Sequence, residues 1–257
     1  MPDCKLSEGL EHRLRQRTAK VGIIGLGYVG LPLAAAAARS GFATIGFDID
    51  PAKTEALTLG RSYIDAVASD EVAGHIAAGR LRATTEFSAL GACDVIVICV
   101  PTPLTEHREP DLSYVEATAR TISRHLRPGQ LVVLESTSYP GTTEDVLKPL
   151  LETGGLVSGR DFWLGFSPER EDPGNKAFHT TNIPKVVAGD GPAALGLVSA
   201  FYGALVDKIV AASSPRAAEA VKLTENVFRA VNMDWVPPEL RENRGEIQAA
   251  QKHRLPS

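Results

Sequence analysis

The chain has 257 residues, of which 44% are hydrophobic, so it can bury one large core or two modest ones. Its formal net charge of −4 gives no reason to expect nucleic acid or a membrane surface as a partner. No apolar run approaches the roughly 18 residues that cross a bilayer, and the first twenty residues mix arginines with acids instead of forming a signal core, so we expect a cytoplasmic protein.

Residues 1–19 form a charged arm with a helical pattern, and residues 20–24 form a short apolar strand that runs directly into the pattern G-x-G-x-x-G at 25–30. An alanine-rich helix over 31–38 and a strand over 43–47 follow, which is the context that a dinucleotide-binding motif requires. In such a motif Gly25 permits the tight turn, Gly27 lets the backbone approach a pyrophosphate, and Gly30 lets helix and strand pack closely. The helix N-terminus then faces the phosphates with its N–H groups and positive dipole end.

Asp48 ends the second strand, 18 positions after Gly30, near the ~20-residue spacing of the carboxylate that binds the adenine ribose hydroxyls. A carboxylate there repels a 2′-phosphate, so the motif favours NAD over NADP, with Lys53 as the nearby cation that could soften the preference. The alternative is a glycine turn in another α/β protein, with Asp48 as a solvated strand end. The cofactor contacts predicted from this segment are Gly25, Gly27, Tyr28, Val29, Gly30, Asp48 and Lys53.

Helical and strand-like stretches alternate along the rest of the chain. We expect helices over 51–59, 69–78, 114–125, 143–151 and 193–202, and strands over 95–100, 131–135, 162–166, 185–188 and 205–211. Asp50 should cap the first of these helices, with Pro51 at its first position. The continuous apolar run 95–100 is typical of a strand buried on both faces. This rhythm predicts a doubly wound, mostly parallel Rossmann-type α/β sheet, which binds ligands at the carboxyl ends of its strands.

Cysteine and histidine usage predicts neither a disulfide framework nor a metal site. Cys4, Cys93 and Cys99 have no metal-like spacing, which suggests a reducing compartment, and the six histidines are scattered. Cys93 and Cys99 flank or lie in a strand that looks buried, so packing is favoured over reactivity for both.

Two segments at predicted strand ends carry polar groups. Pro101 and Pro103 end one strand and present Thr102 and backbone groups to the cofactor side, although alone this is only a strand exit. The turn 135–142 reads Glu-Ser-Thr-Ser-Tyr-Pro-Gly-Thr, and its hydroxyls could meet nicotinamide or a bound water. An equally open interpretation is Thr142 as a helix cap, with Asp145 closing a capping box.

Two more segments combine charge with a defined local geometry. Residues 166–175 read Phe-Ser-Pro-Glu-Arg-Glu-Asp-Pro-Gly-Asn, a rigid polar loop that can aim Glu169 and Arg170 at a ligand, or else a loop of satisfied ion pairs. The helical stretch 218–226 sets Lys222 and Asn226 four residues apart on one face. On periodicity alone that pair would be an ordinary solvated face.

With these motifs, residues 20–232 resemble the UDP-glucose/GDP-mannose dehydrogenase family of nucleotide-sugar dehydrogenases. The sequence of residues 167–175 resembles the branch that oxidises UDP-N-acetylhexosamines more than the UDP-glucose branch. Within that branch UDP-N-acetylglucosamine is the favoured substrate. The resemblance implies an NAD-dependent, four-electron oxidation of a sugar C6 alcohol to the uronate, for surface polysaccharide biosynthesis. The route passes through a thiohemiacetal and a thioester on a cysteine.

The resemblance also implies residue roles. Lys222 and Asn226 would stabilise negative charge on the C6 oxygen, and Glu169 would act as general base, directly or through a water that Thr137 helps to hold. The remaining implied contacts are Arg170 and Glu171 with the substrate, and Pro101, Thr102 and Thr137 with the cofactor.

The sequence departs from the family after residue 232. The family's Gly-Gly-x-Cys-x-Pro-x-Asp segment and second α/β domain do not occur in it, and Pro237 and Pro238 should stop the helix near Asp234. We therefore expect a truncated chain with four parts. These are a charged arm (1–19), an NAD-binding domain (20–212), the truncated start of a connecting helix (213–234) and a polar, disordered tail (235–257).

Three interpretations of function stay open at this point. One is a nucleotide-sugar 6-dehydrogenase completed by a partner chain that supplies the cysteine segment, and another is a catalytically silent NAD-binding module. A distant third is a hydroxyacid dehydrogenase that shares only the dinucleotide fold, which does not explain 167–174. The sequence does not fix the oligomeric state.

Overall fold

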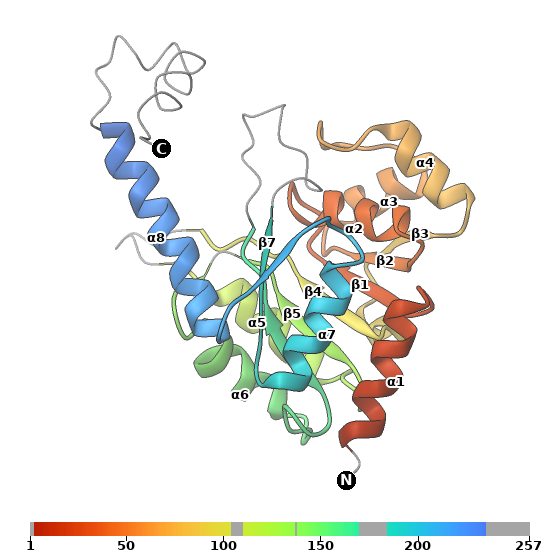
Figure 1. Cartoon of the computed structure of the whole chain (residues 1–257). Helices are drawn as coiled ribbons and strands as arrows, with labels where there is room; N and C mark the ends of the chain where they lie inside the picture. Colours follow the sequence, from red (N-terminus) through yellow and green to blue (C-terminus); the bar gives the residue numbers. More distant parts are fainter. Residues whose placement is uncertain (1–2, 104–109, 137, 170–183, 235–257) are drawn as a thin grey trace. The chain divides into compact units, whose positions relative to one another are not determined.

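The computed structural model describes residues 3–103, 110–136, 138–169 and 184–234 (Figure 1). The chain divides into two compact units, Met1–Glu219 and Ala220–Ser257. All the strands of the described part lie in the first unit.

One mixed sheet organises the first unit. Its eight strands in the described residues follow the order β3-β2-β1-β4-β5-β6-β7-β8. Neighbouring strands are parallel except for β6 and β7, which are antiparallel. The predicted doubly wound, mostly parallel sheet is thereby confirmed. The strands are β1 (Lys20–Ile24), β2 (Ala43–Phe47), β3 (Leu81–Thr84), β4 (Val95–Ile98), β5 (Leu131–Leu134), β6 (Trp163–Phe166), β7 (Lys185–Gly189) and β8 (Ile209–Ala211).

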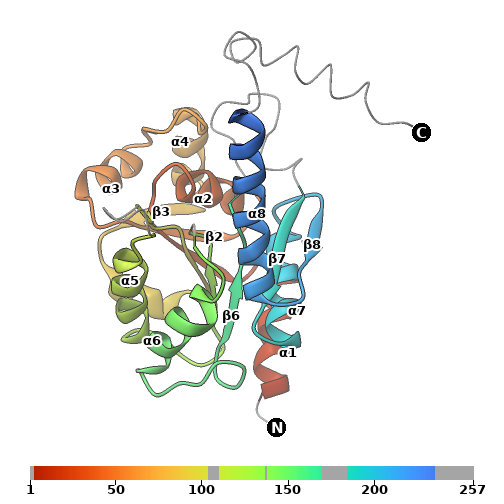
Figure 2. The same cartoon turned by 90° about the vertical axis from the view of Figure 1, so that its left-hand side faces the viewer.

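Helices cover both faces of the sheet, because its central strands are apolar on both sides. Val95 and Val97 of β4 pack with α2 and α7, whereas Ile96 and Ile98 pack with α5 and the segment from η2 to α6. Figure 2 shows α5 and α6 on one side of β6 and α7 on the other. The helical segments are α1 (Asp3–Arg15), α2 (Gly30–Arg39), α3 (Pro51–Thr58), α4 (Ser69–Ala77), the 3₁₀ helix η1 (Phe87–Ala92), α5 (Ser113–Ser123), the π-helix η2 (Thr142–Leu147), α6 (Lys148–Glu152), α7 (Pro192–Tyr202) and α8 (Pro215–Asp234).

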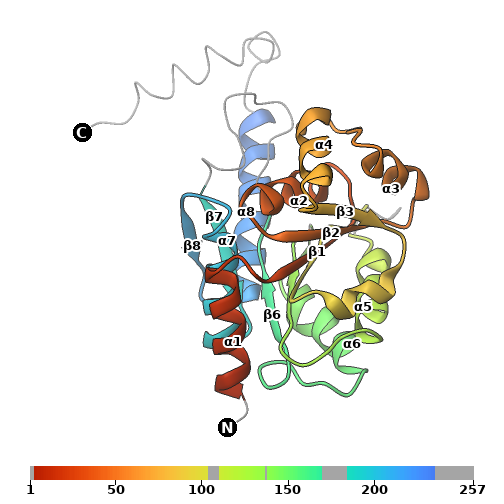
Figure 3. The ribbon, with the colours of Figure 1, turned by 90° about the vertical axis from the view of Figure 1, so that its right-hand side faces the viewer.

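The N-terminal arm forms a helix that belongs to the core of the first unit. Leu10 and Leu14 of α1 are fully buried in the same apolar cluster as Phe201 of α7, and Figure 3 shows α1 beside α7. Arg13 extends the attachment, since its guanidinium lies 3.2 Å from a carboxylate oxygen of Asp94 at the start of β4. The helical pattern of the arm was thus readable from the sequence, but the burial of its leucine stripe was not.

Several local predictions can be compared directly with the structure. Asp50 accepts a hydrogen bond from the Ala52 amide at 2.9 Å and caps α3, with Pro51 at its first position, as predicted. Cys93 and Cys99 are buried free thiols, which confirms the packing interpretation. The strand expected over 205–211 is shorter, because 205–208 form the turn that leaves α7.

The described residues contain no helix that is both long enough and apolar enough to cross a membrane. Nor do they bring three or more His, Cys, Asp or Glu side chains together in a cluster that could hold a metal ion.

Candidate cofactor and substrate site

The glycine motif forms a tight loop between β1 and α2. Gly25 has φ +90°, and a Cβ placed there would lie 2.6 Å from the Cys99 carbonyl oxygen. At Gly30 a Cβ would lie 1.8 Å from the Gly25 carbonyl oxygen, which no side chain tolerates. At Gly27, by contrast, no atom lies within 4 Å of an added Cβ. Two glycines are therefore required by the loop itself, whereas the third faces open space.

Asp48 anchors this loop from the end of β2. Its side chain is buried, and Oδ2 accepts a hydrogen bond from the Leu26 amide at 2.8 Å and from Lys53 Nζ at 3.1 Å. Oδ1 accepts a third hydrogen bond, from the Asp50 amide at 3.0 Å. The carboxylate is thus held at the mouth of the glycine loop, with Lys53 beside it as the sequence suggested.

Tyr63, in the segment between α3 and α4, is a second anchor that the sequence did not reveal. Its hydroxyl donates a hydrogen bond to the Leu26 carbonyl at 2.9 Å. Burial, with the nearby Asp48 and Asp50 carboxylates, raises the pKa of the hydroxyl, which therefore stays protonated at neutral pH. Ile49, next to Asp48, was also missed and is 79% exposed, so it offers an apolar surface at the same strand end.

These features fit a dinucleotide. α2 begins at Gly30, and no side chain caps its N-terminus within the described ranges. A helix end of this kind, with open space at Gly27, can receive a pyrophosphate, and a fixed carboxylate at Asp48 can receive ribose hydroxyls.

The strand exits after β4 and β5 lie beside one another. Pro101 is exposed and Thr102 is half-buried. Ser136 ties the two exits together, because its hydroxyl donates to the Val100 carbonyl at 2.7 Å. Thr137, predicted to contact the cofactor and to help hold a water for Glu169, lies outside the described residues.

One of the two interpretations left open for the turn after β5, a capping box of Thr142 and Asp145, is wrong. The residue before η2 is Gly141, with φ +103°, and no side chain of its own segment caps the helix. Thr142 instead exchanges hydrogen bonds with the backbone of Tyr139. The caps come from Glu219, whose buried carboxylate accepts from the Gly141 amide at 2.6 Å and the Thr143 amide at 2.9 Å. A partner this far along the chain leaves no local sequence signal.

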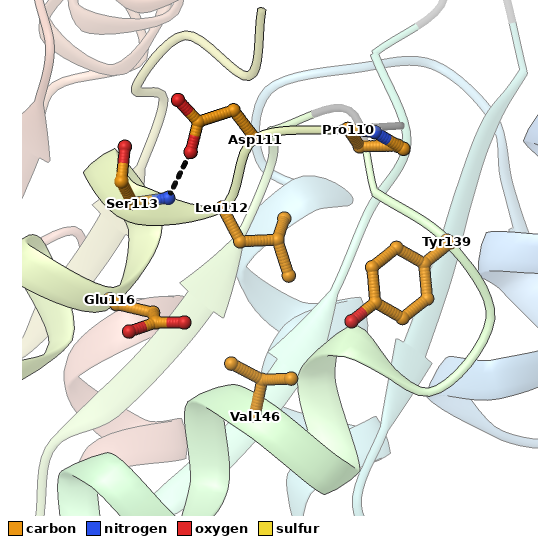
Figure 4. A pocket seen from close by; sticks show the side chains of 7 residues that line it. All are labelled: Pro110, Asp111, Leu112, Ser113, Glu116, Tyr139 and Val146. Atoms are coloured by element: carbon orange, nitrogen blue, oxygen red, sulfur yellow. Dashed lines mark hydrogen bonds between the residues drawn. The ribbon is translucent and has the colours of Figure 1, made fainter. Parts of the chain in front are cut away.

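A pocket lies between the start of α5 and η2 (Figure 4). Asp111 accepts a hydrogen bond from the Ser113 amide at 2.9 Å on its rim, and the Tyr139 side chain closes the side nearest the turn after β5. None of the predicted site residues lines it. The lining residues are Pro110, Asp111, Leu112, Ser113, Glu116, Tyr139 and Val146.

The segment after β6 carries the predicted base. Ser167 is buried and donates a hydrogen bond to the Val186 carbonyl at 2.8 Å, which fixes the strand exit. Glu169 is half-buried, and its Oε2 lies 3.5 Å from the Lys185 Nζ. Lys185 also pairs with Glu135, which in turn accepts a hydrogen bond from Tyr202. The sequence reasoning gave none of Lys185, Glu135 and Tyr202 a role.

The structure does not place the other predicted substrate and catalytic residues together with Glu169. Arg170 and Glu171 fall outside the described residues. Lys222 and Asn226 both lie on α8, in the unit Ala220–Ser257. Their four-residue spacing on one helix agrees with the prediction, and their roles stay predictions.

The comparisons with known proteins agree with this geometry. Residues 19–206 match the family model described as "UDP-glucose/GDP-mannose dehydrogenase family, NAD binding domain". The UDP-N-acetyl-D-glucosamine 6-dehydrogenase of Pseudomonas aeruginosa is 38% identical over 216 residues, which are 83% of this chain and 50% of that protein. The UDP-N-acetyl-D-mannosamine dehydrogenase of Pyrococcus horikoshii is 34% identical over 215 residues, 83% of this chain and 51% of that protein.

Solved structures give the same result. The P. horikoshii UDP-D-ManNAc dehydrogenase has a TM-score of 0.78 at 35% identity and matches 83% of this chain and 51% of that chain. The ternary complex of GDP-mannose dehydrogenase from P. aeruginosa also has a TM-score of 0.78, at 30% identity, over 84% of this chain and 51% of that one. A 3-hydroxyisobutyrate dehydrogenase from Salmonella typhimurium, at 18% identity and a TM-score of 0.56, shares the fold alone. The chain thus spans about half the length of the relatives it matches.

Proposed function

The chain belongs to the UDP-glucose/GDP-mannose dehydrogenase family, and from this premise we propose that it provides the NAD-binding half of a nucleotide-sugar 6-dehydrogenase. The reaction is the oxidation of the C6 alcohol of a UDP-sugar to the uronate, in the synthesis of surface polysaccharide. UDP-N-acetylglucosamine is the favoured substrate, and the enzyme works in the cytoplasm.

One structural observation carries the proposal. The carboxyl ends of parallel strands share one edge of a sheet, and here the glycine loop after β1, Asp48 after β2 and Glu169 after β6 all follow such ends. A dinucleotide held at Gly27 and Asp48 and a carboxylate at Glu169 therefore belong to one ligand-binding edge.

The roles proposed for individual side chains come from the family resemblance, and the placement of strand ends supports the one proposed for Glu169. NAD supplies the hydride acceptor. Glu169 takes the proton from the C6 hydroxyl, directly or through a water that Thr137 holds. Lys222 and Asn226 donate hydrogen bonds to the C6 oxygen as negative charge develops on it, and Arg170 and Glu171 bind the sugar nucleotide.

The choice of sugar rests on the relatives. Proteins named UDP-N-acetyl-D-glucosamine 6-dehydrogenase, from P. aeruginosa and Salmonella typhi, are 38% and 35% identical to the chain. UDP-N-acetyl-D-mannosamine dehydrogenases are nearly as similar, at 34–36%. An N-acetylated UDP-hexosamine is common to both groups, and the two epimers must be compared directly.

The test is to mix the purified chain with NAD⁺ and, separately, UDP-N-acetylglucosamine, UDP-N-acetylmannosamine, UDP-glucose and GDP-mannose, and to record NADH formed per sugar consumed. The proposal expects NADH with an N-acetylated sugar, from the chain alone or with a partner chain that supplies the cysteine segment. Two NADH per sugar indicate complete oxidation, and one indicates arrest at the aldehyde.

A Glu169→Gln variant is the control for this assay, because it keeps the size of the side chain and removes the proposed base. If no sugar yields NADH from folded protein that binds NAD⁺, with or without such a partner, the dehydrogenase proposal is wrong and a silent NAD-binding module is left.

A further inference from the structure

Four buried or half-buried polar side chains form a connected set, which we name the Lys185 network. Lys185 Nζ pairs with Oε1 of Glu135 and lies 3.5 Å from Oε2 of Glu169. The Tyr202 hydroxyl donates a hydrogen bond to the other oxygen of Glu135. The Lys185 ammonium also lies 5.5 Å from the centre of the Tyr202 ring. The Lys185 ammonium thus lies between the carboxylates of Glu135 and Glu169. The Glu135 carboxylate is also fixed by its hydrogen bond from Tyr202.

The strand order explains why these residues meet. Glu135 and Glu169 follow β5 and β6, which are parallel, so both lie at the carboxyl edge of the sheet. β7 runs antiparallel to β6, so its first residue, Lys185, arrives at that same edge. Tyr202 ends α7, which packs on β7 and β6. Lys185 reaches the edge that carries the two carboxylates because β7 runs in the opposite direction to β6.

Because the Lys185 network is buried, it contributes little net free energy to folding. The side chains of Lys185 and Glu135 are 8% and 1% exposed, and Tyr202 is fully buried. The free energy needed to desolvate a buried ion pair is about as large as the electrostatic attraction gained. Apolar side chains of similar volume often stabilise a fold as well or better. Glu169 is the most exposed of the three charged groups, at 16% of its side chain, so the network opens toward solvent at the proposed base.

We propose that Lys185 is a positioning residue, whose buried ammonium, itself fixed by Glu135 and Tyr202, holds the Glu169 carboxylate ionised and oriented to accept a proton. This inference rests on the role proposed above for Glu169. It gives two buried charged residues, Lys185 and Glu135, a part in the reaction without requiring that either touch the substrate.

The electrostatics of the surrounding elements support the assignment. Within the part of the chain that the structure describes, the titratable groups that face Lys185 are Glu135 after β5, Glu169 after β6, Tyr202 on α7 and Cys99 after β4. Burial acts to lower the pKa of Lys185, but the two carboxylates outweigh it and hold that pKa above its ordinary value. Burial raises the pKa of the Cys99 thiol and of the Tyr202 hydroxyl, so both stay neutral. Lys185 is therefore the group in this set that carries a positive charge at neutral pH.

The experiment is a carboxyl ¹³C NMR titration of the full chain with ¹³C-labelled glutamate, with the two signals assigned from Glu135→Gln and Glu169→Gln. In Lys185→Met the Glu169 midpoint should move up by about one pH unit or more, since an opposite charge within ~4–6 Å lowers an acid's pKa by that order. Lys185→Arg, which restores the charge, should return the midpoint toward wild type. Lys148→Met removes an ammonium 2.8 Å from Asp190 in a different pair and should leave Glu169 unchanged.

An unchanged Glu169 midpoint in folded Lys185→Met overturns the proposal. If that variant does not fold by circular dichroism, Lys185→Met/Glu135→Gln is compared with Glu135→Gln alone, and the midpoint must again rise. In an assembly that forms NADH, the acid limb of kcat/KM should move to higher pH in Lys185→Met and return in Lys185→Arg, a shift that a purely structural role would not produce. The NMR result needs no turnover, so absence of NADH refutes the proposed function without deciding this one.

Discussion

Two glycines of the G-x-G-x-x-G motif, Gly27 and Gly30, differ in how much space surrounds them. At Gly30 an added Cβ would meet the Gly25 carbonyl oxygen, whereas at Gly27 it would meet nothing within 4 Å. The fold therefore depends on Gly30, and any need for glycine at Gly27 must come from a ligand. This difference separates a cofactor site from an ordinary glycine turn.

We predict that Gly27→Ala folds with nearly wild-type thermal stability but binds NAD⁺ at least about tenfold more weakly, because its methyl group occupies the path of the pyrophosphate. Gly30→Ala should instead lose about 1–3 kcal/mol of unfolding free energy or more through overpacking. Calorimetric titration with NAD⁺ and urea unfolding measure the two effects. Wild-type NAD⁺ affinity in Gly27→Ala would contradict the cofactor role of this loop.

Glu135 gives the fold a pH dependence whose sign can be stated. Burial raises the pKa of Glu135 to about 7, against an ordinary value of 4.5, although the Lys185 ammonium opposes the shift. A carboxyl whose folded-state pKa is raised contributes stability that is fully present below about pH 4.5 and is lost as the pH rises through about 7.

We therefore predict that the unfolding free energy of the wild type, measured relative to Glu135→Gln, falls between about pH 4.5 and pH 7. Urea unfolding at several pH values measures it, and carboxyls that do not interact with Glu135 cancel because they titrate alike in both proteins. A constant difference across this range would show that Glu135 does not take up a proton in the folded state.

At the scale of elements, the start of η2 depends on a side chain from α8. Glu219 is fully buried and accepts hydrogen bonds from two backbone amides and from the Thr143 hydroxyl. Arg216, one turn earlier, pairs with Asp145 at 2.8 Å on the exposed side. The turn after β5, which carries Thr137 and Tyr139, is thus connected to the beginning of α8.

We predict that Glu219→Ala loses about 2–4 kcal/mol of unfolding free energy. The substitution leaves the buried amides of Gly141 and Thr143 without a hydrogen-bond acceptor. Asp145→Ala is the matched control, since it removes an exposed carboxylate that pairs with Arg216 of the same helix and should cost less than about 1 kcal/mol. Thermal or urea unfolding distinguishes them. Equal losses in the two variants would refute the capping role of Glu219.

Some strands and contacts could be predicted from the sequence and others could not, for physical reasons. The strands with continuous apolar runs, such as β4, could be predicted because both of their faces are buried. β3 was missed, because its four residues, Leu-Arg-Ala-Thr, form an edge strand with little apolar character. The same holds for the candidate site, where the glycine loop and Asp48 lie close together in the sequence and could be singled out from it. Lys185 meets its partner Glu135 across 50 positions, a contact that only the strand order creates.

At the scale of the whole first unit, the arm that precedes the sheet is part of its core. Leu10 and Leu14 are both fully buried against α7, and the Arg17 guanidinium lies 5.3 Å from the centre of the Phe42 ring. α7 also carries Tyr202, so α1 supports the helix that completes the Lys185 network.

We predict that Leu14→Ala lowers the unfolding free energy by about 2–5 kcal/mol, the usual cost of a buried leucine. Lys5→Ala, at an exposed position of the same helix, should change it by less than about 0.5 kcal/mol. Differential scanning calorimetry compares the two. If Leu14→Ala melts like the wild type, α1 is a dispensable extension and not part of the core.

If Asp48 selects the cofactor of this NAD-binding domain, calorimetric titration of the purified chain with NAD⁺ and with NADP⁺ will show the selection. We predict that NAD⁺ binds and that NADP⁺ binds at least about tenfold more weakly, because a carboxylate repels a 2′-phosphate. Asp48→Asn should reduce this difference in affinity. No binding of NAD⁺ to folded protein, or a preference for NADP⁺, would contradict this prediction.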